Sequence, residues 1–222
     1  MSAAAAAGAG AGVPDGEHVL LSVGPVVPVV VLDDVEHAVP LARALAAGGI
    51  RVMEVTLRTP AGLGSIERVA AEVPDVLVGA GSVASGEQVA AVSRAGGQFL
   101  VLPGAPPSLL DAALDSGLPV VPGAATVTEV MVLAERGVAL VKFFPAEPSG
   151  GTRFLDAVRG PLPGLRFCPT GGVGPANARD YLALPNVPCV GGSWVTPPEL
   201  VRSGQWDRVT ELAAQASALA TD

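Results

Sequence analysis

The alternation of two kinds of segment constrains the fold of this chain more than any other feature. Short runs rich in Val, Leu and Ile alternate with Ala- and Leu-rich stretches whose apolar residues recur at helical spacing. The expected strands are Val26–Leu32, Arg51–Leu57, Val76–Val83, Gln98–Pro103, Leu118–Gly123, Leu140–Pro145, Leu165–Thr170 and Val187–Gly192. The expected helices are Glu36–Ala47, Gly62–Val73, Gly86–Ala95, Ser108–Ser116, Val127–Arg136, Gly151–Arg159, Pro175–Leu184 and Gln205–Ala220.

These segments form eight successive strand–helix units. Strands that are apolar on both faces and alternate with helices are typical of an all-parallel sheet covered by helices. The sequence therefore predicts an α/β fold, and eight units favour a (β/α)₈ TIM barrel in a single domain over residues 16–222. A doubly wound open sheet is the alternative, although no Gly-x-Gly-x-x-Gly follows the first strand. Residues 1–15 are rich in Ala and Gly, and we expect them to form a disordered tail.

Composition and charge argue against several classes of partner. A net charge of −8 disfavours binding to nucleic acid or to an anionic membrane, and no apolar run is suited to span a bilayer. Cys168 and Cys189 are the only cysteines, too few for a disulfide framework, and the chain lacks Cys-x-x-Cys and His-x-x-x-His spacings for zinc. The first residues also lack the positive charge of a signal peptide. We expect a cytoplasmic protein with neither a metal nor an organic cofactor.

Lys142 is the only lysine of the chain, and it lies inside the apolar run at residues 139–145. Burial of an ammonium group is costly, so such a position favours the neutral amine, the form that attacks carbonyl groups to make a Schiff base. The alternative is an edge-strand lysine whose charged head reaches water. The polar residues of a second predicted strand favour a catalytic Lys142.

That second strand, at residues 51–57, carries polar side chains among apolar ones. Glu54, Thr56 and Arg58 are spaced two residues apart, so they face the same side. A carboxylate inside a barrel is costly unless it is paired or used, and the structural alternative is a buried Glu54–Arg58 ion pair. By strand parity Lys142 also points inward, into the same cavity as Glu54. An amine nucleophile and a proton-transferring carboxylate are the groups that Schiff-base carbon–carbon chemistry requires.

Two glycine pairs end the last two predicted strands. Gly171 and Gly172 follow the seventh strand, and Gly191 and Gly192 end the eighth. In barrel enzymes the loops after strands seven and eight often bind phosphate, because exposed backbone N–H groups can approach the anion. The alternative is that these glycines only satisfy the geometry of the strand ends.

Five blocks of sequence resemble the signatures of bacterial 2-keto-3-deoxy-6-phosphogluconate (KDPG) aldolases. The same family includes 4-hydroxy-2-oxoglutarate (KHG) aldolases. The blocks occur in the family's order, from about Gly24 to the final helix. They are Glu54-Val-Thr-Leu-Arg-Thr, Val78-Gly-Ala-Gly-Ser, Lys142-Phe-Phe-Pro-Ala-Glu, Phe167-Cys-Pro-Thr-Gly-Gly and Gly191-Gly-Ser-Trp.

The resemblance implies a class I aldolase of the Entner–Doudoroff pathway, a homotrimer of barrels that yields pyruvate and glyceraldehyde 3-phosphate. It implies that Lys142 forms the Schiff base and that Glu54 transfers protons. The implied substrate contacts are Arg58 and Ser82 at the pyruvate carboxylate, Thr170 beside the substrate, Gly171, Gly172 and Ser193 at the phosphate, and Pro103 and Phe144 as its apolar lining.

One departure from the family concerns Ser82, where the block commonly reads Gly-Ala-Gly-Thr. Serine keeps the hydroxyl but lacks the methyl that restricts its rotation, so we expect the contact to survive with a looser orientation. The motifs leave KHG and 2-keto-3-deoxy-6-phosphogalactonate cleavage open as alternatives. A sugar-phosphate isomerase or epimerase that uses Glu54 as a base, and a phosphate-binding barrel with a structural Lys142–Glu54 pair, are more distant ones.

Overall fold

The computed structural model describes residues 23–219, and the expected tail at residues 1–15 lies outside these described residues. The strands are β1 (Val26–Val30), β2 (Val52–Thr56), β3 (Leu77–Gly81), β4 (Leu100–Val101), β5 (Val120–Val121), β6 (Gly123–Ala124), β7 (Leu140–Phe143), β8 (Arg166–Pro169) and β9 (Val190–Gly192). The helices are η1 (Val35–His37), α2 (Ala38–Ala47), α3 (Ala61–Glu72), α4 (Gly86–Arg94), α5 (Pro107–Asp115), α6 (Val127–Glu135), α7 (Gly151–Arg159), α8 (Ala178–Leu182), α9 (Pro198–Arg202) and α10 (Trp206–Ser217).

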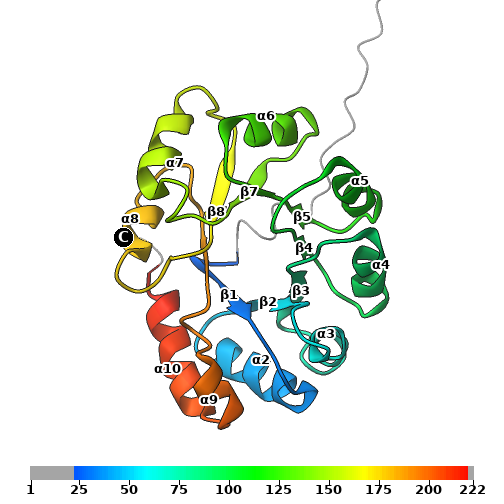
Figure 1. Cartoon of the computed structure of the whole chain (residues 1–222). Coiled ribbons are helices and arrows are strands. Elements are labelled where there is room, and N and C mark those ends of the chain that lie inside the picture. Colours follow the sequence, from blue (N-terminus) through cyan, green and yellow to red (C-terminus); the bar gives the residue numbers. More distant parts are fainter. Residues whose placement is uncertain (1–22, 220–222) are drawn as a thin grey trace, which may run out of the picture.

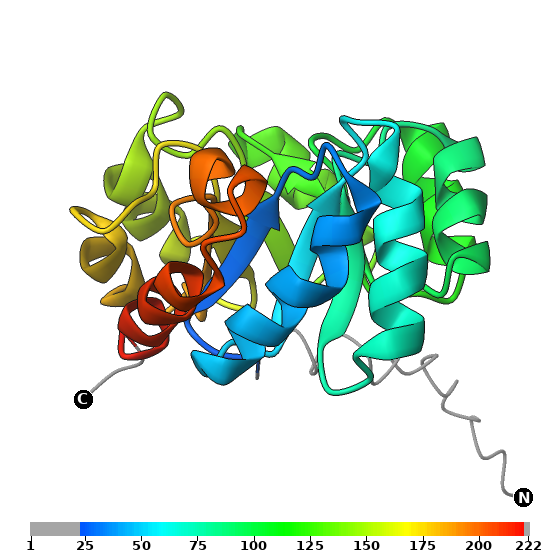
Figure 2. The same cartoon turned by 90° about the horizontal axis from the view of Figure 1, so that it is seen from below.

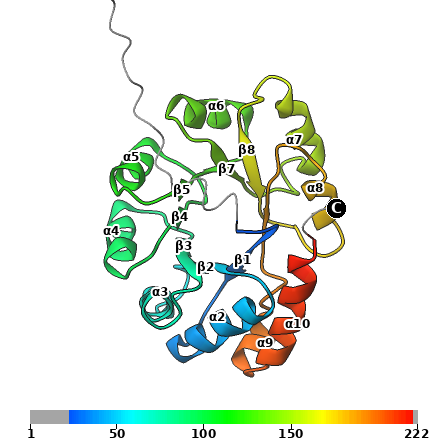
Figure 3. The same cartoon turned by 180° about the vertical axis from the view of Figure 1, so that it is seen from behind.

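All described strand pairs are parallel, and they form two sheets. One sheet has six strands in the order β5-β4-β3-β2-β1-β9, and the other has three in the order β6-β7-β8. The strands lie at the centre of the molecule and the helices surround them (Figures 1 and 3). The prediction of an α/β fold with parallel strands is confirmed.

Burial on both faces of the strands explains their apolar sequences. Every position of β1 and β2 is buried, as expected for strands that have helices on one side and further strands' side chains on the other. Helix α10 lies against α2 at the end of the chain (Figure 2). Their close approach depends on Gly48, where a Cβ atom would lie 2.5 Å from the Cβ of Ala213.

The structure differs from the expected elements in three places. The predicted fifth strand is divided into β5 and β6 at Pro122, because proline lacks the N–H group that a ladder hydrogen bond needs. The helix expected from Pro175 begins only at Ala178. Helix α9, which was not expected, starts at Pro198, where the fixed φ of proline suits the first turn of a helix.

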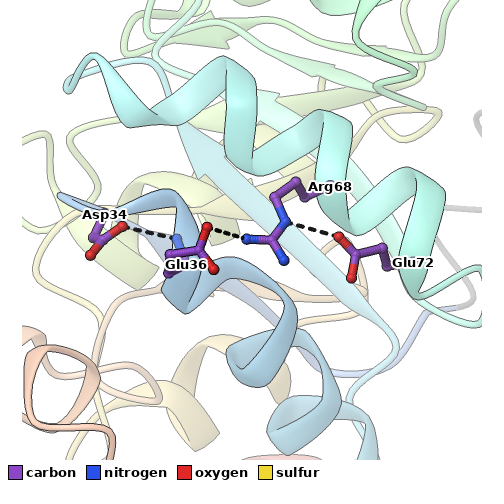
Figure 4. Close-up of polar contacts among 4 residues, drawn as sticks. All are labelled: Asp34, Glu36, Arg68 and Glu72. Carbon is purple, nitrogen blue, oxygen red and sulfur yellow. Dashed lines mark hydrogen bonds and ion pairs between the residues drawn. The ribbon is translucent and has the colours of Figure 1, made fainter.

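A polar cluster joins the segment after β1 to α3 (Figure 4). Arg68 pairs with Glu36 at 2.8 Å and with Glu72 at 2.8 Å, and Asp34 accepts a hydrogen bond from the backbone N–H of Glu36 at 2.9 Å. The hydrogen bond from Arg68 lowers the pKa of Glu72 below its ordinary value. Because these groups are exposed to solvent, the cluster orients the two segments and adds little to the free energy of folding.

None of the helices at residues 23–219 combines the length and apolar character that crossing a membrane requires.

Candidate active site

Lys142 and Glu54 lie next to each other in the interior of the molecule. Lys142, on β7, donates a hydrogen bond from Nζ to Oε1 of Glu54, on β2, over 3.2 Å. The two residues are only 3% and 2% exposed. Glu54 therefore pairs with Lys142 and not with Arg58, which had been the structural alternative. A buried ion pair gains little stability over a well-packed apolar core, so its presence favours a role in chemistry.

The space for the Glu54 carboxylate is created by a glycine on the neighbouring strand. A Cβ atom at Gly81, on β3, would lie 2.1 Å from Oε1 of Glu54. A small cavity of about 20 Å³ adjoins the pair, with Glu54, Lys142 and Thr170 among its lining residues. Such a volume holds about one water molecule. The Lys142 amine and the Glu54 carboxylate thus share one enclosed space.

Two thiols line the same cavity, and their burial argues against either as a nucleophile. Cys168 and Cys189 are both buried and free. A hydrogen bond with Cys168, together with burial, raises the pKa of the Cys189 thiol well above its ordinary value. A thiol with a raised pKa stays protonated and unreactive near neutral pH. Both cysteines are therefore buried members of the hydrophobic core.

Arg58 and Ser82 form a second group, at the ends of β2 and β3. Nε of Arg58 donates to Oγ of Ser82 over 2.8 Å. Ser82 has a φ of +57°, the one non-glycine residue with positive φ at residues 23–219. This left-handed conformation is uncommon outside glycine and is concentrated at functional sites. A guanidinium beside a hydroxyl is a suitable site for a carboxylate.

Thr170 and Phe144 border the lysine from two sides. Thr170, at the end of β8, is 7% exposed and pairs with Gly191 through a parallel bridge. A Cβ atom at Gly191 would lie 2.2 Å from Oγ1 of Thr170, so only glycine leaves room for this hydroxyl. The Phe144 ring lies 5.4 Å from Nζ of Lys142, within the range of a cation–π contact.

The loop after β8 has the positive φ values that its two glycines allow. Gly171 and Gly172 have φ values of +97° and +82°. The backbone N–H of Glu147 donates to the carbonyl of Gly171 over 3.1 Å, and the Asn177 side chain donates to the carbonyl of Gly172 over 3.1 Å. A Cβ atom at Gly172 would lie 2.6 Å from Cγ of Glu147. Residues outside the loop therefore hold it in place by hydrogen bonds to its carbonyl groups.

The remaining predicted residues lie at the strand ends without direct contact to the lysine. Gly192, at the end of β9, is buried beneath Trp194. A Cβ atom at this position would lie 1.7 Å from the indole ring. Ser193 is exposed, and its carbonyl accepts from the backbone N–H of Thr196 over 3.2 Å. Pro103 is exposed beyond the end of β4.

Comparison with known proteins identifies the family of this chain. The family model for KDPG and KHG aldolases matches residues 18–212. The chain belongs to this family. A 2-dehydro-3-deoxy-phosphogluconate aldolase of Pseudoalteromonas atlantica is 53% identical to it, covering 90% of this chain and 93% of the relative. The KHG/KDPG aldolase of Escherichia coli is 51% identical, covering 89% and 92%.

A solved structure of the same family has the same fold. The KDPG aldolase of Legionella pneumophila, crystallised with pyruvate captured as a covalent carbinolamine intermediate, superimposes with a TM-score of 0.87 at 44% identity. The match covers 89% of this chain and 96% of the Legionella chain.

Three residues around the glycine loop were not singled out from the sequence of this aldolase-family chain. Glu147 ends one of the signature blocks but carried no predicted role. Tyr181, on α8, contacts the Glu147 carboxylate through its hydroxyl. Burial and this contact raise the pKa of Tyr181, so the phenol remains a hydrogen-bond donor. Asn177 lay inside the expected helix Pro175–Leu184, where it gave no signal of a role in the loop.

Proposed function

We propose that this chain is a class I aldolase that cleaves KDPG to pyruvate and glyceraldehyde 3-phosphate. The observation that carries the proposal is the buried Lys142–Glu54 pair, with Nζ and Oε1 3.2 Å apart, in a chain of the KDPG and KHG aldolase family. The carbinolamine captured in the Legionella enzyme supports covalent catalysis by an amine in this family.

Lys142 is the nucleophile of the proposed reaction. Its neutral amine adds to the C2 carbonyl of the substrate to form a carbinolamine, and loss of water gives an iminium ion. The C4 hydroxyl loses its proton as the C3–C4 bond breaks, and the electron pair of that bond moves into the iminium. Glyceraldehyde 3-phosphate leaves. The remaining enamine is protonated at C3, and hydrolysis releases pyruvate and the free amine.

Glu54 carries the protons of these steps. Its distance from Nζ is within hydrogen-bond reach, which supports a role in dehydrating the carbinolamine and in protonating the enamine carbon. Thr170 contributes a hydroxyl beside the same cavity. A sugar-phosphate isomerase would use Glu54 alone, so the buried amine beside Glu54 favours the aldolase. A phosphate-binding barrel could hold the same Lys142–Glu54 pair as a structural element, and the family match over residues 18–212 favours the aldolase over it.

Substrate binding divides between two ends of the site. Arg58 and Ser82 bind the carboxylate of the keto acid, and their 2.8 Å hydrogen bond supports this pairing. The loops of Gly171–Gly172 and Gly191–Ser193 bind the phosphate, with Pro103 and Phe144 as apolar lining. Support comes from Gly172 and Ser193, which are both exposed at neighbouring strand ends.

The proposal includes closure of the two sheets into a single-domain (β/α)₈ barrel. Only Pro122 separates β5 from β6, and its carbonyl accepts from the N–H of Lys142 over 2.9 Å. The Thr170–Gly191 bridge joins the end of β8 to β9. These two links connect the sheets at both edges. A closed barrel would bring strand ends that carry Glu54 and Lys142 to one mouth.

A cytoplasmic homotrimer completes the proposal. Val127, Met131 and Val132 on α6 are 41%, 48% and 48% exposed, an unusual concentration of large apolar side chains on one helix. A hollow of about 420 Å³ has Val132 in its lining. We assign this face of α6 to the contact between subunits. Two free buried cysteines are consistent with a reducing compartment.

A second activity, cleavage of KHG, is favoured by the Escherichia coli relative, whose name covers both substrates. An assay coupled to lactate dehydrogenase tests the proposal with KDPG, its galactonate epimer and 4-hydroxy-2-oxoglutarate. We expect pyruvate release from KDPG with the highest kcat/KM. Absence of pyruvate release from all three substrates would refute the aldolase assignment. Equal kcat/KM for KDPG and 4-hydroxy-2-oxoglutarate would remove the phosphate preference.

A further inference from the structure

Asn177 lies at the start of α8, yet its side chain does not cap that helix. Asparagine is among the preferred N-cap residues because its side-chain oxygen can accept from the first turn. Here Asn177 occupies the N-cap position without a capping hydrogen bond. Both ends of its amide instead contact the preceding loop: Oδ1 accepts from the N–H of Gly174 over 2.8 Å, and Nδ2 donates to the carbonyl of Gly172 over 3.1 Å.

Two contacts fix the direction of two backbone N–H groups of the loop, and Asn177 makes one of them. The peptide bonds of the loop are trans, so each carbonyl points opposite to the N–H of the next residue. The Gly172 carbonyl points to Asn177, and the N–H of Val173 therefore points away from it. The Gly171 carbonyl accepts from Glu147, so the N–H of Gly172 points away from that residue. Neither N–H donates to another group at residues 23–219.

The loop needs this external support because its own backbone is permissive. Gly171 and Gly172 both have positive φ, and glycine gains more freedom than any other residue when it is not held. Backbone N–H groups bind an anion well only when their directions are fixed before binding. Within the described contacts, the carbonyl of Gly172 is held by one donor, the Asn177 amide.

We propose that Asn177 is a positioning residue that holds the Gly171–Val173 loop ready for a phosphoryl group. Through this loop it sets the preference for phosphorylated over unphosphorylated substrates. The inference rests on the proposed function, because it assumes that the loop binds the phosphate of the substrate. Glu147 supports the same loop from the other side, where its stem packs on Gly172 and its carboxylate contacts Tyr181.

The test compares Asn177→Ala with the parent enzyme on KDPG and on unphosphorylated 2-keto-3-deoxygluconate. Loss of one oriented, charge-assisted hydrogen bond predicts a fall of about 10- to 100-fold in kcat/KM for KDPG, mainly through KM. The unphosphorylated substrate and borohydride trapping of pyruvate at Lys142 should be unchanged. The inhibition constant of inorganic phosphate should rise by the same factor. Gln215→Ala, which truncates an exposed amide on α10, is the control.

A second variant, Asn177→Asp, tests the donor and the acceptor of the side chain separately. It also replaces Asn177→Ala if the alanine variant does not fold. Aspartate can still accept from Gly174 but cannot donate to Gly172, so KDPG should again be affected selectively. Ala176→Asp, at an exposed neighbouring position, controls for the added charge. Equal losses of kcat/KM on both substrates, or no loss on KDPG, would overturn the role of Asn177 but would leave the proposed function standing. A parent enzyme that fails to prefer KDPG would overturn the proposed function together with this inference.

Discussion

Lys142 is the proposed nucleophile of this aldolase, and it offers an unusually simple covalent test. Because it is the only lysine, borohydride reduction in the presence of pyruvate should add one adduct to the chain at Lys142. The α-amino terminus is the only competing primary amine, and peptide mapping distinguishes the two. Lys142→Arg should give no adduct and no activity, because guanidinium stays protonated. An adduct confined to the N-terminus would contradict the role of Lys142.

Glu54 can be tested by a substitution that preserves its shape. Glu54→Gln keeps a hydrogen-bonding group near Nζ but cannot transfer protons, so kcat should fall by about 10²- to 10⁴-fold. Exchange of the pyruvate methyl protons into deuterated water should decrease in parallel, because the role proposed for Glu54 includes protonation of the enamine. Thermal unfolding checks that the protein still folds when the buried Lys142 lacks its carboxylate partner. Unchanged proton exchange would assign the base to another residue.

The proximity of Lys142 and Glu54 was predictable from the sequence, whereas the residues that hold the loop after β8 were not. A lone lysine in an apolar run and a carboxylate of inward parity are rare enough to suggest chemistry at once. Asn177 and Tyr181 are ordinary helix residues in the sequence. Their importance arises from contacts with Gly172 and Glu147 that depend on the path of two loops. Sequence spacing does not specify such paths.

At the level of single elements, α6 has the most complete start signal among the described helices. Oγ1 of Thr126 accepts from the N–H of Glu129, whose carboxylate accepts in turn from the N–H groups of Ala125 and Thr126, both over 2.9 Å. Thr126→Ala should lower the free energy of unfolding by about 1 kcal/mol, since substitutions at such caps cost roughly 0.5–2 kcal/mol. Urea unfolding measures this change in the free energy of unfolding. Thr126→Ser, which keeps the hydroxyl, should be close to neutral.

The same cap makes part of the stability depend on pH. The hydrogen bond from the N–H of Ala125 is the main cause that lowers the pKa of Glu129. A lowered folded-state pKa means that the stabilisation is present above the ordinary pKa of glutamate and is lost as the pH falls through the lowered value. Glu129→Gln should therefore reduce stability at neutral pH and have less effect in acid. Equal effects at both pH values, measured by urea unfolding, would contradict this linkage.

Most elements could be predicted because hydrophobic periodicity and turn residues agree along the chain. The expected helix at Gly151–Arg159 matches α7, and β2 lies within the expected Arg51–Leu57. The errors fall where proline acts locally: Pro122 divides a strand, and Pro198 starts a helix too short to have a recognisable period. Periodicity identifies an element's type, while single residues determine where it is interrupted.

For the whole molecule, the number of strand–helix units predicted the α/β class with parallel strands, but not which surfaces of the subunits make contact. Contacts between subunits depend on surface residues. In the sequence, apolar residues that are exposed on a helix have the same spacing as apolar residues that face the core. Only the three-dimensional arrangement reveals that Val127 and Met131, one helical turn apart on α6, face outward together. The subunit contact is therefore a prediction of the structure rather than of the sequence.

Met131→Glu tests this contact directly. A carboxylate placed in a desolvated subunit interface without a partner is strongly unfavourable, so the variant should dissociate from trimer to monomer. Sedimentation velocity at matched concentrations measures the change, and Ala90→Glu, at an exposed position on α4, adds the same charge away from the face. The fold of the monomer should persist, since Met131 is 48% exposed and contributes little to the core. A Met131→Glu protein that still sediments as a trimer would place the contact on another surface.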